Sequence, residues 1–127
     1  MTEYQILNLM YVAFISNAMY FVGCVLLVWL GFRMANNIYN SSENNMPAKI
    51  FTSLYCVLVA VILFYTQQVG GGIFNAYVAQ LADMGASSAD RLQPYLDNPL
   101  VIGGSVQTLF TFVVVVFQLA IVWSKKS

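Results

Sequence analysis

An uncharged run near the C-terminus constrains the fold more than any other feature of the sequence. It extends over the twenty-four residues from Leu100 to Trp123. As a helix rising about 1.5 Å per residue, this run is long enough to cross the ~30 Å hydrocarbon core of a bilayer. Two similar runs precede it. We therefore expect an all-α integral membrane bundle, a single transmembrane domain over residues 1–127, with spans at about 4–33, 50–69 and 99–123.

The composition narrows the chemistry that such a bundle can perform. Only 8% of the residues are charged, against roughly a quarter in soluble domains, and the net charge is zero. A neutral chain gives no electrostatic case for a nucleic-acid partner. Histidine is missing from the sequence, which removes the commonest metal ligand and general base. No Asp, Glu, Lys or Arg falls inside the spans, the first of which ends at Arg33, and Cys24 and Cys56 sit in apolar runs. We therefore predict no catalytic residues, no cofactor and no metal, and a protein that is not an enzyme.

Each span carries small and polar residues on one face, as judged by placing residues at 100° intervals. Membrane helices use such faces to pack closely, because lipid provides no hydrophobic drive for association. This pattern predicts that the three faces meet in a bundle. Asn17 has two interpretations, a hydrogen bond to a neighbouring helix or part of a polar path. The predicted packing residues are Ala13, Asn17, Tyr20, Cys24 and Gly31 in the first span, Thr52, Cys56, Ala60 and Gln67 in the second, and Gly104, Gln107, Thr108, Thr111 and Gln118 in the third.

Three consecutive glycines, Gly70, Gly71 and Gly72, interrupt the second apolar run. Each weakens a helix by roughly 1 kcal/mol relative to Ala, so we predict a kink or break there. Residues 73–84 would then continue as a short interfacial helix. The triplet has two interpretations: a hinge at the membrane surface, or a discontinuous helix that frames a substrate or ion site together with Gln67 and Gln68.

The distribution of charge predicts the topology. Arg33 and Lys49 flank the first loop, and Lys125 and Lys126 follow the third span. The positive-inside rule places both segments in the cytoplasm, with the N-terminus outside and the C-terminus inside. The other loop is acidic and is either a solvated connector or a docking site for a partner. Its candidate partner-binding residues are Asp83, Asp90, Arg91 and Asp97.

These patterns favour a non-enzymatic structural or scaffold subunit whose partners are the lipid bilayer, other membrane subunits or copies of itself. A bacterial inner membrane, or a virion membrane derived from one, is the expected setting. The alternative is a small oligomeric pore former, because three spans with the N-terminus out and a basic tail resemble the topology of one class of phage holins. That alternative places Asn17, Gln67, Gln107, Thr111 and Gln118 around a lumen. A third hypothesis is a transporter or lipid-binding subunit that uses the glycine break.

Overall fold

A computed structural model describes residues 2–41 and 45–124 of the chain. Within these residues the secondary structure is entirely α-helical. The helices, in chain order, are α1 (Glu3–Asn40), α2 (Met46–Asp83), α3 (Ser87–Leu96) and α4 (Ser105–Ser124). Three of them, α1, α2 and α4, are long and apolar enough to cross a membrane. The predicted all-α class is therefore confirmed for these residues, and three helices could serve as the predicted spans.

Side-chain caps define where the two longest helices begin. The Thr2 hydroxyl accepts from the backbone N–H of Gln5 at 3.2 Å, and Gln5 Oε1 accepts from the backbone N–H of Thr2 at 3.0 Å. This reciprocal capping box pairs N–H groups that the start of a helix otherwise leaves free. At the start of α2, Asn45 Oδ1 accepts from the N–H of Ala48 at 3.3 Å. Pro47 lies in that first turn, where its missing N–H interrupts no helical hydrogen bond.

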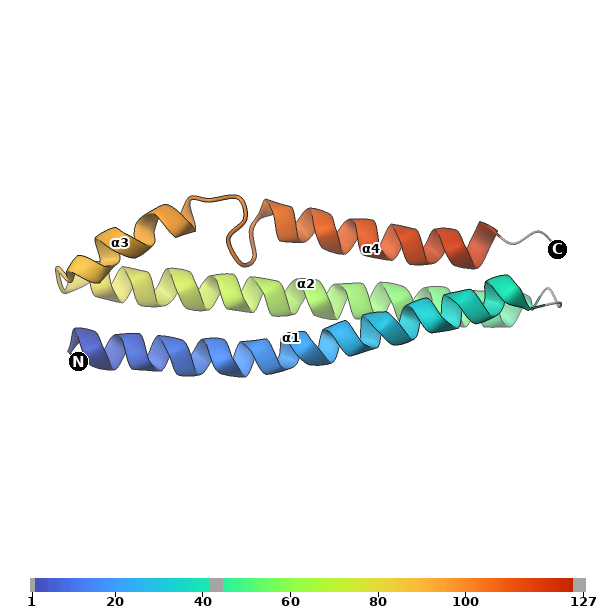
Figure 1. Cartoon of the computed structure of the whole chain (residues 1–127), viewed down its shortest axis with the longest axis horizontal. Coiled ribbons are helices and arrows are strands. Elements are labelled where there is room, and N and C mark those ends of the chain that lie inside the picture. The colour runs from blue at the N-terminus through green and yellow to red at the C-terminus, as the bar shows by residue number, and fades with distance from the viewer. Residues whose placement is uncertain (1, 42–44, 125–127) are drawn as a thin grey trace.

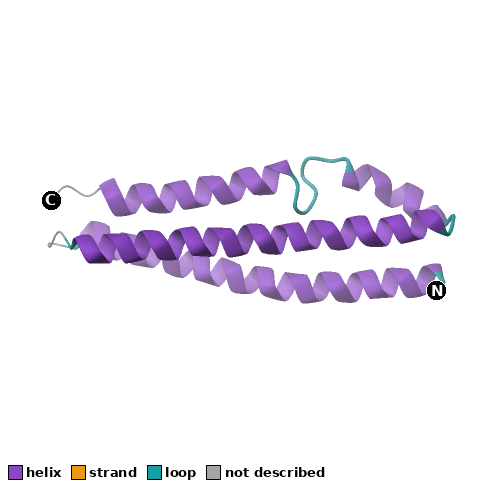
Figure 2. Ribbon diagram, turned by 180° about the vertical axis from the view of Figure 1, so that it is seen from behind, coloured by secondary structure: helices purple, strands orange, loops and turns teal. Residues whose placement is uncertain are grey.

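The helices α1 and α2 form a long antiparallel hairpin, and the rest of the chain returns along α2 (Figure 1). The helix α4 lies beside the N-terminal part of α2, α3 lies beside its C-terminal end, and a loop separates them (Figures 1 and 2). The bundle thus has two halves. The α4 half comprises α4 with residues 17–40 and 46–71. The α3 half comprises α3 with residues 3–16 and 72–83.

Buried positions recur every seven residues along the two long helices. On α1 this series is Met10, Asn17, Cys24 and Gly31. On α2 there are two such series, Lys49, Cys56, Leu63 and Gly70, and Thr52, Val59 and Thr66. A seven-residue repeat keeps one seam against a neighbour when helices wind gently around each other with a left-handed twist. The contact face therefore follows a period of 3.5 residues rather than the 3.6 of a straight helix.

The glycine triplet does not divide the second helix. The helix α2 is continuous from Met46 to Asp83, so of the predicted kink or break the break is wrong, and residues 73–83 belong to α2 rather than to a separate interfacial helix. A kink within the continuous helix stays a prediction. Helical hydrogen bonding persists because neighbours on both sides stabilise this segment. The ring of Phe74 packs edge-on against that of Phe14 in α1, with centroids 5.8 Å apart. The third span also differs from expectation, since regular helix begins at Ser105 instead of residue 99.

One end of the bundle gathers the two tryptophans and their cations. Lys49 Nζ lies 5.6 Å from the ring centroid of Trp123, and the Arg33 guanidinium lies 5.2 Å from that of Trp29. The indole N–H of Trp123 also donates to the Ser53 hydroxyl at 2.8 Å. The start of α2 and the end of α4 are therefore adjacent, as the topology requires. Lys125 and Lys126, which were used to orient the chain, lie outside the described residues.

Candidate functional site

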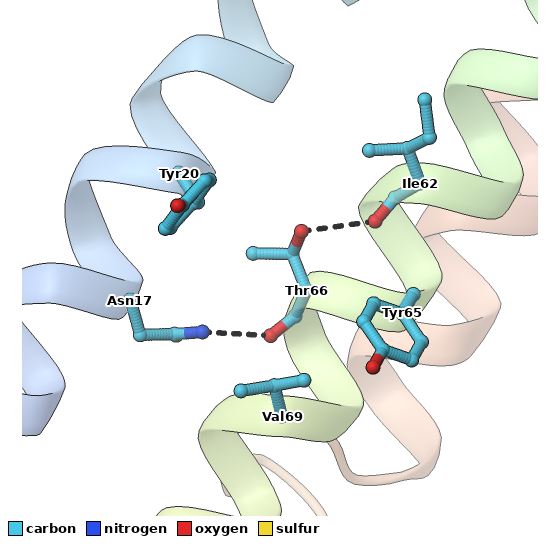
Figure 3. Close-up of a pocket in the computed structure, with 6 residues that line it drawn as sticks. All are labelled: Asn17, Tyr20, Ile62, Tyr65, Thr66 and Val69. Atoms are coloured by element: carbon cyan, nitrogen blue, oxygen red, sulfur yellow. Dashed lines mark hydrogen bonds between the residues drawn. The ribbon is translucent and has the colours of Figure 1, made fainter.

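Polar side chains from all three long helices meet inside the bundle in an amide cluster, formed by Asn17, Thr66, Gln67, Gln107 and Thr111. Asn17 Nδ2 donates to the backbone carbonyl of Thr66 at 3.0 Å, as Figure 3 shows. The Thr111 hydroxyl donates to Gln67 Oε1 at 3.1 Å, and both side chains are buried. Buried hydrogen bonds of this kind join helices where lipid cannot compete for them. The predicted polar faces therefore point at one another.

A second set of contacts joins α4 to α1 nearer the tryptophan end. Gln118 Nε2 donates to the backbone carbonyl of Val28 at 3.0 Å. A Cβ atom at Gly31 would lie only 2.8 Å from that same nitrogen, so glycine is needed for the amide to reach α1. Cys24 Sγ lies 3.7 Å from the Thr66 hydroxyl oxygen. The small residues of the first span thus make room for polar groups of its neighbours.

The loop between α3 and α4 lies directly against the glycine triplet. Gly103 has φ +78°, and a Cβ there would lie 2.8 Å from the carbonyl oxygen of Gln67. A Cβ at Gly71 would lie 2.9 Å from the carbonyl oxygen of Ile102. Glycine at both positions allows the two backbones to touch. Gly70 and Gly71 therefore form a docking surface for this loop, which explains them without a hinge.

Amide side chains on both sides satisfy the backbone of this loop. Gln68 Nε2 donates to the carbonyl of Gly103 at 3.1 Å, and the N–H of Gly103 donates to Gln107 Oε1 at 2.8 Å. Irregular backbone beside apolar helices requires such partners, because an unpaired peptide group in hydrocarbon costs several kcal/mol. Gln68 and Gln107 thus hold the loop in place.

A shallow cavity of about 300 Å³ opens on the surface between α1 and α2. Tyr20 and Tyr65 stand on the two helices at its sides, and both are largely exposed (Figure 3). The polar groups of Asn17 and Thr66 are already engaged, since the Thr66 hydroxyl donates to the carbonyl of Ile62 at 2.9 Å. Its six lining residues include no charged side chain. Such a surface suits an acyl chain or another apolar group.

The predicted packing residues divide into three groups. Eight are buried within the described bundle: Asn17, Cys24, Gly31, Thr52, Cys56, Gln67, Thr111 and Gln118. Four are half-buried: Ala13, Ala60, Gly104 and Gln107. Tyr20 and Thr108 are exposed. Tyr20 borders the shallow cavity, and the Thr108 hydroxyl donates only to the Gly104 carbonyl, four residues earlier. A straight-helix wheel groups these two with the buried face, whereas the adjacent residues Phe21 and Gln107 are the half-buried ones.

The predicted hinge and the predicted partner-binding loop also have defined places. Gly70 is buried and Gly71 is half-buried against the loop, while Gly72 is exposed with no heavy atom of a neighbour within 4 Å of an added Cβ. The charged residues of the acidic segment are all exposed: Asp83, Asp90, Arg91 and Asp97. They lie on or beside α2 and α3, so most of the segment is helical.

Several contacts escaped sequence reasoning. Thr66 stands at the centre of the amide cluster, and Gln68 holds the loop, yet neither was assigned to a packing face. The seven-residue series Thr52, Val59 and Thr66 was the available signal for the first. Ser88 on α3 is 1% exposed, and its hydroxyl has no hydrogen-bond partner among the described residues. Nothing in the sequence distinguishes it from Ser87.

Across residues 2–41 and 45–124 there is no group of three or more Cys, Asp or Glu side chains positioned to hold a metal ion. Comparison with known proteins found no matching family model, no matching curated protein and no matching solved structure.

Proposed function

We propose that the chain is a non-enzymatic integral membrane subunit that packs through one flank of its α3 half against copies of itself or other membrane subunits. The observation that carries this proposal is the open space around Gly72. Gly72 lies in the interior of α2, where glycine costs about 1 kcal/mol relative to Ala. No close contact within the chain needs it, since an added Cβ would meet open space. Close approach of a helix from another subunit would explain why this position is glycine.

The exposed surface of α1 indicates how far the bilayer extends along the bundle. Large apolar side chains are exposed on α1 from Leu9 to Leu30, a stretch of about 33 Å at 1.5 Å per residue. This length matches the hydrocarbon core of a bilayer. The contact between Phe14 and Phe74 brings residues 72–79 of α2 beside this stretch, which supports a position at membrane depth.

At that depth, the α2 flank differs from a surface that faces lipid. From residue 70 to residue 83, all of which are described, α2 exposes no large apolar side chain. Its exposed residues in the middle of this segment are small or polar: Gly72, Asn75, Ala76 and Ala79. The neighbouring α3 exposes Asp90 and Asp97, which are costly against hydrocarbon. A second protein surface on this flank would remove both conflicts.

The geometry gives less support to the pore-forming alternative. Asn17, Gln67 and Gln118 were expected to line a lumen between copies, but their side chains are buried and hydrogen-bonded within one chain. Lining a lumen would require these helices to separate and exchange their partners. The proposed setting remains a bacterial inner membrane or a virion membrane derived from it, with the N-terminus outside.

Bulky substitution on the flank tests self-association. Ala76→Ile and Gly72→Ile should lower the oligomeric fraction of the purified chain in lipid nanodiscs at least tenfold, measured by native mass spectrometry. Ala120→Ile is the matched control, because Ala120 is an exposed alanine on α4 and the substitution is the same. Circular dichroism checks that each variant keeps its helices. A wild-type chain that stays monomeric at every lipid ratio would remove self-association from the proposal.

A photo-cross-linking amino acid tests the wider case of other subunits in the native membrane. At position 79 it should give protein adducts, whereas at position 58, where Leu58 is 53% exposed on the apolar surface of α2, it should give lipid adducts. Lipid adducts at both positions would show that the flank faces the bilayer, and the proposal would then be wrong.

A further inference from the structure

A second cavity, of about 470 Å³, lies between the start of α1 and one face of α3. The α1 side is formed by Leu7 and Tyr11. The α3 side is formed by Ser88, Arg91, Leu92 and Tyr95. Leu7 and Leu92 also pack against the small core of Ile6, Leu81 and Ala89, so the floor of the cavity is apolar and ordered. The cavity therefore combines an apolar base with a cation and two phenol groups.

The charges of α3 are segregated around its axis. With 100° per residue, the four α3 residues of the cavity fall within an arc of about 100°, whereas Asp90 and Asp97 lie about 180–200° from Ser88. Arg91 is the only basic residue between Lys49 and Lys125 in the sequence. Its guanidinium has no ion pair among the described residues, Glu3 included, which lies one turn before Leu7. The cavity face is thus basic on a helix that is otherwise acidic.

Ser88 supplies an independent sign of a missing ligand. It is 1% exposed and lines the cavity, and its Oγ has no hydrogen-bond partner among residues 2–41 and 45–124. Leaving a buried hydroxyl unpaired costs about 1–3 kcal/mol. A polar group in the cavity that accepted a hydrogen bond from the Ser88 hydroxyl would remove this penalty. Arg91, one turn further along the same face, can donate to the same acceptor.

We propose that this cavity binds the phosphate of an anionic lipid headgroup. Arginine presents a planar set of donors that matches phosphate oxygens, and the Ser88 hydroxyl adds one more donor. The Tyr11 and Tyr95 phenols border the headgroup, and the apolar floor of Leu7 and Leu92 contacts the glycerol and the first carbons of the acyl chains. The ligand is therefore amphiphilic and carries net negative charge.

The position of the cavity favours a lipid over a soluble phosphate compound. Leu7 and Tyr11 flank Leu9, where the exposed apolar stretch of α1 begins. Headgroups of the adjoining leaflet lie at that boundary, with acyl chains along α1. Tyrosine is enriched at this depth in membrane proteins, because its ring is apolar and its hydroxyl is polar. The site requires no second copy of the chain, so it is independent of the proposed assembly.

Lipid retention tests the proposal. The full chain is placed in nanodiscs of phosphatidylcholine and phosphatidylglycerol, and the lipids that remain on its monomer are counted by native mass spectrometry. Phosphatidylglycerol should be retained at least fivefold over phosphatidylcholine. Arg91→Gln should remove about nine-tenths of that preference, whereas Arg33→Gln, at the opposite end, should leave it unchanged. Equal retention of the two lipids by the wild-type chain would overturn the proposal.

Two further arms separate a ligand site from a structural role, and a lipid from a soluble ligand. Ser88→Ala should lower phosphatidylglycerol retention about threefold. If Ser88→Ala leaves retention unchanged, the unpaired hydroxyl takes no part and the proposed donor set is wrong. Millimolar glycerol phosphate should not displace the lipid. Displacement at such concentrations would show that the cavity binds soluble phosphates and would overturn the assignment to a headgroup.

Discussion

The two halves of the bundle use the same pair of long helices and differ in what packs against them. In the α4 half, a third helix of 20 residues fills the groove of α1 and α2, and the polar groups of all three are paired inside. In the α3 half, the third element is a 10-residue helix with Pro94 in its last turn and a core of three small or medium residues. The α4 half pairs its polar groups inside and has the shallow cavity beside Tyr20 and Tyr65. The α3 half leaves the larger cavity beside Ser88 and an uncovered flank.

This difference separates two uses of glycine and polar residues in a membrane bundle. Gly71 and Gly103 let backbones of the same chain approach closely, and Gly31 makes room for the Gln118 amide, whereas Gly23 of the α4 half faces open space. In the α3 half, Gly72 also lies on the surface. The buried small or polar residues are explained by their neighbours, and the exposed Gly72 is the position that the proposed assembly would cover.

The largest expected effect is that of removing glycine where the loop meets α2. An alanine at position 103 would have to adopt a left-handed backbone conformation, and its Cβ would clash with the Gln67 carbonyl. Gly103→Ala should therefore destabilise the fold by about 3 kcal/mol. Gly85→Ala has a similar φ, +71°, in open space and should cost only about 1 kcal/mol. Gly72→Ala should instead stabilise the monomer by about 1 kcal/mol. Unfolding in mixed micelles measures all three. Equal losses at Gly103 and Gly85 would contradict the docking contact.

A smaller effect should distinguish the cores of the two halves. Leu81→Ala empties the core under α3 and should cost about 2 kcal/mol, at the lower limit for buried leucines. Because α3 packs on this core whereas α1 and α2 also contact each other along the α4 half, hydrogen exchange should accelerate mainly in residues 87–96. Leu63→Ala, in the α4 half, should lower global stability and leave the relative protection of α3 unchanged. If Leu81→Ala accelerated exchange equally in α4, the halves would form one cooperative unit.

The smallest effect concerns the pairing inside the amide cluster. A double-mutant cycle of Gln67→Met and Thr111→Val should give a coupling energy of about 0.6 kcal/mol, typical of hydrogen bonds between membrane helices. The cycle of Gln67→Met with Thr108→Val is the control, because the Thr108 hydroxyl donates only to the carbonyl of Gly104, just before α4. A coupling energy of zero in the first cycle would show that Gln67 and Thr111 are close but form no stabilising hydrogen bond.

Much of the amide cluster could be predicted from the sequence. Asn17, Gln67, Gln107, Thr111 and Gln118 stand out because amides are rare in apolar spans and need partners there. Their exact neighbours could not be predicted. A helix wheel identifies the packing face of one helix, but it shows neither which helix packs there nor how the helices twist around each other. Tyr20 and Thr108 were therefore placed on the packing face although they lie at its edge.

Run length and absence of charge depend on no tertiary contact, so the amino-acid sequence was enough to predict three helices that are apolar enough to cross a membrane. The role of the glycine triplet, in contrast, depends on the packing of the helices. Local propensity predicts a break there, but the continuous helix is stabilised by α1 on one side and by the loop on another. Which glycines are buried and which remain open is a property of the packed bundle. It depends on contacts between residues that are far apart in the chain.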